Sequence, residues 1–155
     1  MTSWTVQPVA VDSPLATALV HDYLIDIIGR YYGRPATRAE VDRALVEDPT
    51  DDLVAFYVGR HRGQAAGCAG FRLVDPGTAE LKRLYVAAGA RGTGGGAALL
   101  AAVERGAAAL GARRVRLDTR ADLVEARALY AGHGYAEVAP FNADPYAGYW
   151  FEKRL

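Results

Sequence analysis

Hydrophobic residues recur along the chain with two periods, which predict strands and helices. Short stretches rich in β-branched and aromatic residues are typical of strands, and the predicted strands cover residues 4–9, 53–60, 64–74, 80–86, 113–117, 135–138 and 149–155. Longer stretches with hydrophobic residues three or four positions apart are typical of amphipathic helices. The predicted helices begin near positions 13, 37, 96 and 122 and end near positions 28, 48, 111 and 134.

Polar and helix-breaking residues support several of these boundaries. Thr37 and Glu40 have the spacing of a capping box at the start of the second helix. Asp122 and Glu125 have the same spacing before the fourth helix. The glycine and proline residues between positions 29 and 35 are expected to end the first helix.

The order of the predicted elements indicates the fold class. It runs strand, two helices, three antiparallel strands, helix, strand, helix and two strands. No linker is long enough to divide this series, so we expect residues 1–155 to form a single domain. The predicted class is α/β (α+β), with a mixed, mostly antiparallel sheet flanked by about four helices.

Charge balance and cysteine content limit the partners and the compartment. The 18 basic residues equal the 18 acidic ones, so the whole chain lacks the basic surface that attracts nucleic acids or anionic membranes. A single cysteine, Cys68, excludes an internal disulfide and favours a reducing compartment. No signal peptide and no membrane-spanning stretch is present, so we expect a cytoplasmic protein. The excess of arginine, alanine and glycine is typical of a GC-rich bacterial genome.

A glycine-rich run, RGTGGG at residues 91–96, lies between a predicted strand and a predicted helix. Glycine lets the backbone approach a ligand closely and adopt positive φ angles. The unpaired N–H groups and the dipole at a helix N-terminus favour an anion such as phosphate. Arg91 adds a guanidinium group. The run therefore predicts a pyrophosphate site, with a merely flexible loop as the alternative.

The same run also fits a dinucleotide-binding fingerprint. Residues 92–97 satisfy G-x-G-x-x-A, and Asp118 ends the next strand, where an acid could bind a ribose. Three features argue against such an oxidoreductase: residues 87–91 separate the strand from the glycines, the strand itself carries three charges, and antiparallel-type strands precede it. A Walker-type loop is excluded because no Gly-Lys-Ser/Thr is present.

Two motifs resemble those of the GNAT superfamily of N-acetyltransferases. Arg91-x-x-Gly94-x-Gly96 is similar to the acyl-CoA signature Q/R-x-x-G-x-G/A, and it begins five residues after the preceding strand, as in the family. Residues 128–130 (ALY), followed by residues 134–135 (GY), look like the A-x-L-Y element with its downstream G-F/Y. The order of elements resembles the family over the whole chain.

The resemblance implies acetyl-CoA as co-substrate and a sheet whose fourth and fifth strands separate to admit the pantetheine arm. Main-chain groups of the fourth strand would pair with this arm, and the N–H of Leu84 would polarise the thioester carbonyl. The implied cofactor-binding residues are Leu84, Tyr85, Val86, Arg91, Gly92, Thr93, Gly94, Gly95, Gly96 and Ala97.

The resemblance also suggests two catalytic residues. Tyr130 would donate a proton to the leaving thiolate, with a core aromatic residue as the alternative. Glu80 precedes Val86 by six residues, as does the base of the histone-acetylating branch, and would take the proton of the amine. The alternatives for Glu80 are an ion pair with a neighbouring arginine and a water chain as the base. Strand alternation is expected to put Glu80, Lys82 and Leu84 on one face.

The acceptor implied by the resemblance is an amine of a small molecule or peptide. It would bind against the first two helices and the connection before the last strand, where the candidate residues are Tyr23, Asp26, Tyr31, Tyr32, Phe141, Asn142, Asp144 and Tyr146. Leu123 occupies a position where many relatives carry asparagine. The three histidines lack metal-ligand spacing, so no metal is expected. A non-catalytic acyl-CoA-binding module and a homodimer both stay open.

Overall fold

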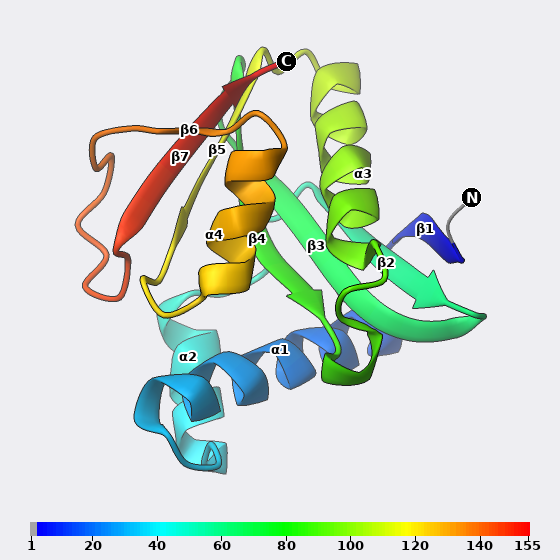
Figure 1. Cartoon of the computed structure of the whole chain (residues 1–155), viewed down its shortest axis with the longest axis vertical. Coiled ribbons are helices and arrows are strands. Elements are labelled where there is room, and N and C mark those ends of the chain that lie inside the picture. Colours follow the sequence, from blue (N-terminus) through cyan, green and yellow to red (C-terminus); the bar gives the residue numbers. More distant parts are fainter. Residues whose placement is uncertain (1–2) are drawn as a thin grey trace.

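A seven-stranded sheet runs through the computed structural model, which describes residues 3–155 (Figure 1). Its strand order is β1-β2-β3-β4-β5-β7-β6, and only the β4–β5 pair is parallel. The strands are β1 (Trp4–Val9), β2 (Ala55–His61), β3 (Gln64–Asp75), β4 (Thr78–Val86), β5 (Arg114–Thr119), β6 (Ala136–Glu137) and β7 (Tyr149–Arg154). The predicted class, a mixed and mostly antiparallel sheet, is confirmed, and the doubly wound parallel sheet of the dinucleotide alternative is wrong.

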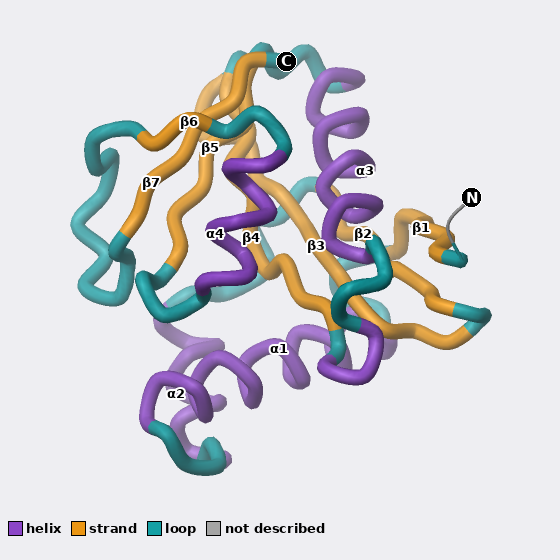
Figure 2. Tube along the Cα trace, in the orientation of Figure 1, coloured by secondary structure: helices purple, strands orange, loops and turns teal. Residues whose placement is uncertain are grey.

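Helices cover both faces of the sheet and form two large cores with it, and a third, smaller cluster surrounds Trp4. They are α1 (Pro14–Tyr32), α2 (Arg38–Glu47), α3 (Gly95–Ala109) and α4 (Val124–Gly132), with a short 3-10 turn at Ala88–Ala90. One core joins the sheet to α3 and α4, and the other joins it to α1 and α2 (Figure 2). Leu99 and Val103 of α3 lie in the first core, and Leu24 of α1 lies in the second.

The first helix extends further than the sequence predicts. It passes through Gly29 and ends at Tyr32, because Gly33 takes the left-handed conformation (φ 68°) that closes the helix. The N–H groups of Gly33 and Arg34 both donate to the Gly29 carbonyl. The second helix begins as predicted, with the Thr37–Glu40 capping box in place.

The fourth helix begins without the predicted capping box. Leu123 is its N-cap residue and makes no side-chain capping bond. The Asp122 carboxylate instead accepts hydrogen bonds from Arg120, and the Glu125 carboxylate pairs with Arg30 of α1. The spacing of these two acids was therefore misleading, because arginines on either side compete for their oxygens.

Strands β4 and β5 pair over three residues only and then separate. The last pair is Glu80 with Arg116, whereas β4 continues to Val86 and β5 to Thr119. In Figure 1 the helix α4 lies beside the gap that results. The separation expected from the family resemblance is therefore present, and it leaves one edge of β4 without a strand partner.

Candidate active site

A cavity of about 810 Å³ lies where β4 and β5 separate. Its walls come from α1, α2, β4, β5, the glycine-rich run, the start of α3, one face of α4, and the connection before β7. Most of the predicted site residues line it: Leu84, Tyr85, Val86, Arg91, Gly92, Gly94, Gly95, Gly96, Ala97 and Tyr130. Two predicted residues, Glu80 and Thr93, are not part of its wall.

The glycine-rich run offers a series of free backbone donors to this cavity. Gly94 is the N-cap of α3, and no side chain caps that helix. Within residues 3–155, the N–H groups of positions 92–97 donate to no protein oxygen. Gly92 and Gly94 have φ angles of 78° and 97°, which other residues rarely adopt. The run therefore fits an anionic group such as a pyrophosphate.

Arg91, the first residue of the glycine-rich run, is held in place by two contacts of its side chain. Its Nε donates to the Val86 carbonyl over 3.0 Å, and one terminal nitrogen lies 3.1 Å from an Asp26 carboxylate oxygen of α1. The guanidinium group is thus fixed beside the glycines, but it already has an acidic partner.

Thr93 and Gly95 shape the run through contacts with Trp4 of β1. The indole N–H donates to the Thr93 hydroxyl over 2.8 Å, and that hydroxyl donates to the Ala90 carbonyl over 2.5 Å. A Cβ atom on Gly95 would lie 2.3 Å from the indole ring. These two residues therefore hold the backbone in place, and the side chain of Thr93 does not face the cavity.

A β-bulge interrupts β4 inside the site. Cys68 and Gly70 of β3 pair with Tyr85 and Lys82, so Arg83 and Leu84 stand opposite a single residue. The bulge reverses the expected alternation: Leu84 packs with Leu81 in the α3–α4 core instead of sharing a face with Lys82. The prediction for the Leu84 face was therefore wrong, because period-two alternation fails at a bulge.

The bulge residue Arg83 is held on both its main chain and its side chain. It has a φ angle of 63°, and its carbonyl accepts a hydrogen bond from the Cys68 thiol over 3.3 Å. Its buried guanidinium group donates to the Asp48 carbonyl and lies 5.7 Å from the centre of the Tyr23 ring. Nothing in the sequence marked Arg83 except a charge inside a strand of the motif.

Tyr130 belongs to the core and to the cavity wall at once. Its side chain is only 5% exposed, and its ring centre lies 5.9 Å from those of both Tyr135 and Phe151. Burial raises the pKa of its hydroxyl, and the nearby Asp118 charge adds to this shift. The hydroxyl is protonated at neutral pH with or without this shift, and the higher pKa makes it a weaker acid.

Glu80 lies in an ion-pair cluster next to the cavity. It is 1% exposed, and one carboxylate oxygen lies 2.9 Å from an Arg72 nitrogen and 3.7 Å from an Arg116 nitrogen. These contacts match the ion-pair alternative for Glu80. Its role as a base stays a prediction.

Asp118 is a polar residue of the cavity wall that the sequence did not mark as catalytic. One of its carboxylate oxygens accepts a hydrogen bond from the Asn142 amide over 2.7 Å. Burial raises the pKa of this carboxyl, while the Asn142 bond and the Lys82 charge oppose the shift. The only sequence signal was a polar residue near the end of a strand.

Other expected residues divide between the cavity and its surroundings. Among the acceptor candidates, those in the wall are Tyr23, Asp26, Tyr31, Tyr32, Asp144 and Tyr146. The Phe141 ring lies under the Arg116 guanidinium group, and the Asn142 amide donates a hydrogen bond to the Asp118 carboxylate. Leu123 is part of the cavity wall.

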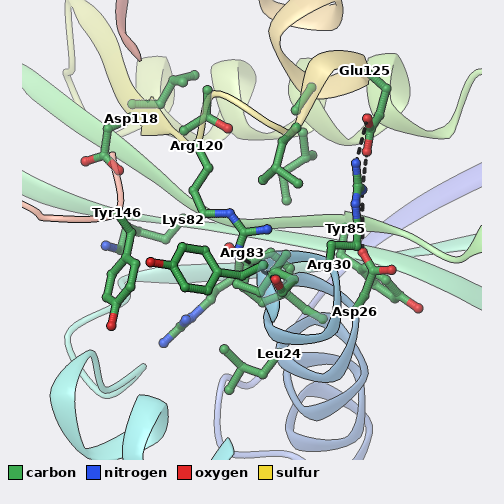
Figure 3. A pocket seen from close by; sticks show the side chains of 18 of the residues that line it. Leu24, Asp26, Arg30, Lys82, Arg83, Tyr85, Asp118, Arg120, Glu125 and Tyr146 are labelled. Carbon is green, nitrogen blue, oxygen red and sulfur yellow. Dashed lines mark hydrogen bonds and ion pairs between the residues drawn. The ribbon is translucent and has the colours of Figure 1, made fainter. Parts of the chain in front are cut away.

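Opposite charges connect α1 to α4 across the cavity. The Arg30 guanidinium group makes two hydrogen bonds to the Glu125 carboxylate and lies 3.8 Å from an Asp26 oxygen (Figure 3). Over residues 3–155, no group of three or more possible metal ligands gathers, and no helix is long and apolar enough to cross a membrane.

Comparison with protein families and solved structures agrees with this geometry. Residues 21–135 match the model of the Acetyltransferase (GNAT) family. The chain is 33% identical over 136 residues to an IAA acetyltransferase of Azospirillum brasilense, a match that covers 86% of this chain and 87% of that protein.

Two solved structures illustrate the shared fold. The PaiA N-acetyltransferase of Thermoplasma acidophilum, in complex with coenzyme A, superposes with a TM-score of 0.74 at 15% identity over 99% of this chain and 100% of that one. A GNAT family acetyltransferase of Elizabethkingia anophelis with acetyl-CoA bound gives a TM-score of 0.69 at 17% identity over 100% of both chains. With the family match over most of its length, the chain belongs to the GNAT family of acetyltransferases.

Proposed function

We propose that this protein is an N-acetyltransferase that moves the acetyl group of acetyl-CoA to an amine of a small molecule or peptide. One observation supports this most directly: the uncapped N–H groups of the glycine-rich run and the Tyr130 side chain line the same cavity, at the gap between β4 and β5. A set of free N–H groups that can bind an anion and a buried proton donor in one cavity suit a thioester substrate with a pyrophosphate.

The glycine-rich run would bind the pyrophosphate of acetyl-CoA, and strand β4 would orient its pantetheine arm. The N–H groups of residues 92–97, with Arg91, would hold the pyrophosphate of acetyl-CoA. The edge of β4 beyond Glu80 has no strand partner, so main-chain groups of Leu84 and the Val86 N–H are available to the pantetheine arm. The Val86 carbonyl already accepts a hydrogen bond from Arg91. The Leu84 N–H lies within the bulge and is the donor we assign to the thioester carbonyl.

The chemistry then requires two proton movements. Bound acetyl-CoA supplies an activated acetyl group and a thiolate leaving group. Tyr130 would give the thiolate its proton, because its hydroxyl is protonated at neutral pH and the residue lines the cavity. The amine must first lose a proton, and Glu80 could accept it only through water, since its side chain does not line the cavity.

The proposal is tested with a library of amines and acetyl-CoA while free thiol is measured. IAA is included because it appears in the name of the Azospirillum brasilense relative. With any acceptor found, Tyr130→Phe is expected to lower kcat by about 100-fold or more, because only the acid is removed. The ring keeps its contacts with Tyr135 and Phe151, so the melting temperature serves as the control. Unchanged kcat would reject Tyr130 as the acid.

A non-catalytic acyl-CoA-binding module is the second candidate. The observation that favours it is the position of Glu80, which leaves the predicted base outside the cavity wall. A module of this kind would bind acetyl-CoA and gain thermal stability from it, but it would release no thiol with any amine of the library.

A further inference from the structure

Asp118 lies on the acceptor side of the gap, close to the point where the strands part. It follows Arg116, the last residue of β5 that pairs with β4, by two positions. Leu117 points into the α3–α4 core, so alternation places Asp118 on the opposite face, toward α1 and α2. In Figure 3, Asp118, Lys82 and Tyr146 gather at one end of the cavity, while Asp26, Arg30 and Glu125 lie at the other.

The Asp118 carboxylate is held in a fixed orientation. The Asn142 amide nitrogen donates to it, while the Asn142 amide oxygen accepts from the Trp150 indole over 3.0 Å and from the Asp144 N–H over 3.2 Å. Because two donors fix the amide oxygen, the amide nitrogen must face Asp118. The carboxylate is thus positioned before any ligand arrives.

This carboxylate has no ion-pair partner among residues 3–155. The nearby cation, Lys82, lies 3.2 Å from an Asp48 oxygen and is engaged there. The other ionisable groups that act on Asp118 are Asp144 of the connection before β7, Glu80 of β4 and Tyr130 of α4. A partly buried carboxylate with acids around it and one free side toward a cavity is suited to bind a cation.

We infer that Asp118 binds the ammonium group of the acceptor and takes its proton. This inference rests on the proposed function and specifies its substrate class: primary amines that are cationic at neutral pH. The ammonium N–H bond breaks, its proton moves to Asp118, and the freed lone pair forms the N–C bond with the acetyl carbonyl carbon.

The remaining protons balance without another reactant. When the C–S bond breaks, Tyr130 gives its proton to the thiolate, and the phenolate regains a proton from the acetylated nitrogen. Asp118 later releases its proton to water. The products are a neutral amide, a thiol and one proton.

The first experiment measures binding without turnover. Coenzyme A-saturated protein is titrated with 2-phenylethylamine and with 2-phenylethanol, its uncharged analogue, by calorimetry. The wild type is expected to bind the amine at least 10-fold more tightly than the alcohol. Asp118→Asn should remove that preference, whereas Asp42→Asn, an exposed acid of α2 outside the cavity wall, should keep it. A wild type without preference, or an Asp118→Asn variant that keeps it, overturns the inference.

The second experiment follows the proton. With any amine that is acetylated, Asp118→Asn is expected to lower kcat/KM by about 100-fold at pH 7. The defect should shrink above the pKa of the amine, where the acceptor arrives already deprotonated. A defect that stays constant with pH would overturn the proton-accepting role.

These results separate the two proposals. If no amine is acetylated but Asp118 governs amine binding, the proposed function and the proton transfer fail while the binding site stands. If Tyr130→Phe lowers kcat and Asp118→Asn does not, the function stands and the inference fails. The acetyl-CoA affinity and the melting temperature of Asp118→Asn show whether its fold is intact, since asparagine can still accept the Asn142 hydrogen bond.

Discussion

Single residues at this site have contacts that one-dimensional motifs do not reveal. The six-residue distance to Val86 predicts Glu80 as a base, but its carboxylate lies between Arg72 and Arg116. Arg72 lies opposite Glu80 on the neighbouring strand β3, eight positions earlier in the sequence, whereas Arg116 belongs to β5, which follows α3. Tyr130 was predicted from a motif as well, and in that case the cavity reaches it. Two residues predicted from motif positions therefore lie in different environments, one in an ion-pair cluster and one in the cavity wall.

The Glu80 cluster predicts a clear effect on stability. Glu80→Gln leaves two arginines facing a neutral amide. We expect this change to lower the free energy of unfolding by about 2–3 kcal/mol. This loss is at the low end for a broken buried ion pair because both arginines are partly exposed. Urea denaturation measures this loss. Glu137→Gln, on the exposed strand β6, is the control and should change stability by less than about 0.5 kcal/mol.

Kinetics on the folded Glu80→Gln variant tests the other role of this residue. A fall in kcat at a temperature where the variant is fully folded would support Glu80 as the base. A loss of stability of less than about 0.5 kcal/mol would contradict the ion-pair role instead.

At the scale of elements, the four glycines of the run serve two different purposes. Gly92 and Gly94 have positive φ angles, which the turn before α3 requires. Gly95 and Gly96 lie where a Cβ atom would approach Trp4 within 2.3 Å and Leu129 within 2.9 Å. The first pair sets the path of the backbone, and the second pair lets α3 start close to β1 and α4.

Alanine substitutions should distinguish these purposes. Gly95→Ala forces the rigid indole of Trp4 to move, and we expect it to lower the free energy of unfolding by about 3 kcal/mol or more. Gly92→Ala meets no atom within 4 Å and should cost only about 1 kcal/mol for its positive φ angle. Thermal denaturation of both variants tests this order. Equal losses would show that the contact with Trp4 does not limit the position.

The elements also show which signals in the sequence were reliable. The hairpin that joins the predicted strands 53–60 and 64–74 turns at Arg62 and Gly63, which both have positive φ angles. The capping box of α2 depends on neighbours in the chain and was predicted correctly. The start of α4 depends on Arg30 of α1, and the β4 bulge depends on pairing with β3, so neither could be predicted from local spacing.

At the scale of the whole molecule, α1 connects the glycine-rich run to the start of α4. Its Asp26 reaches Arg91 beside the glycine-rich run, and its Arg30 reaches Glu125 at the start of α4. The fold and the cavity wall followed from the order of elements and the motifs, but these cross-cavity ion pairs did not. They join residues 65 and 95 positions apart, and single charges on a helix surface carry no information about such partners.

The contact between Asp26 and Arg91 has a consequence for acetyl-CoA binding. A pyrophosphate bound to the glycine-rich run must compete with the Asp26 carboxylate for the Arg91 guanidinium group, and the two anions repel each other. Asp26→Asn removes both effects, so we expect acetyl-CoA to bind about 3- to 10-fold more tightly, the range of a partly exposed ion pair. Calorimetric titration at low and high salt measures it, and the gain should decrease with salt.

Asp22, one turn earlier on the same helix, supplies the matched control because it is exposed and does not line the cavity. Asp22→Asn removes the same charge from α1 and should change the acetyl-CoA affinity by less than about 2-fold, as expected of a charge without a direct contact. Tighter binding in both variants would attribute the effect to the net charge of α1. Weaker binding in Asp26→Asn alone would mean that Asp26 orients Arg91 for the pyrophosphate, so that the ion pair prepares the glycine-rich run and does not compete with its ligand.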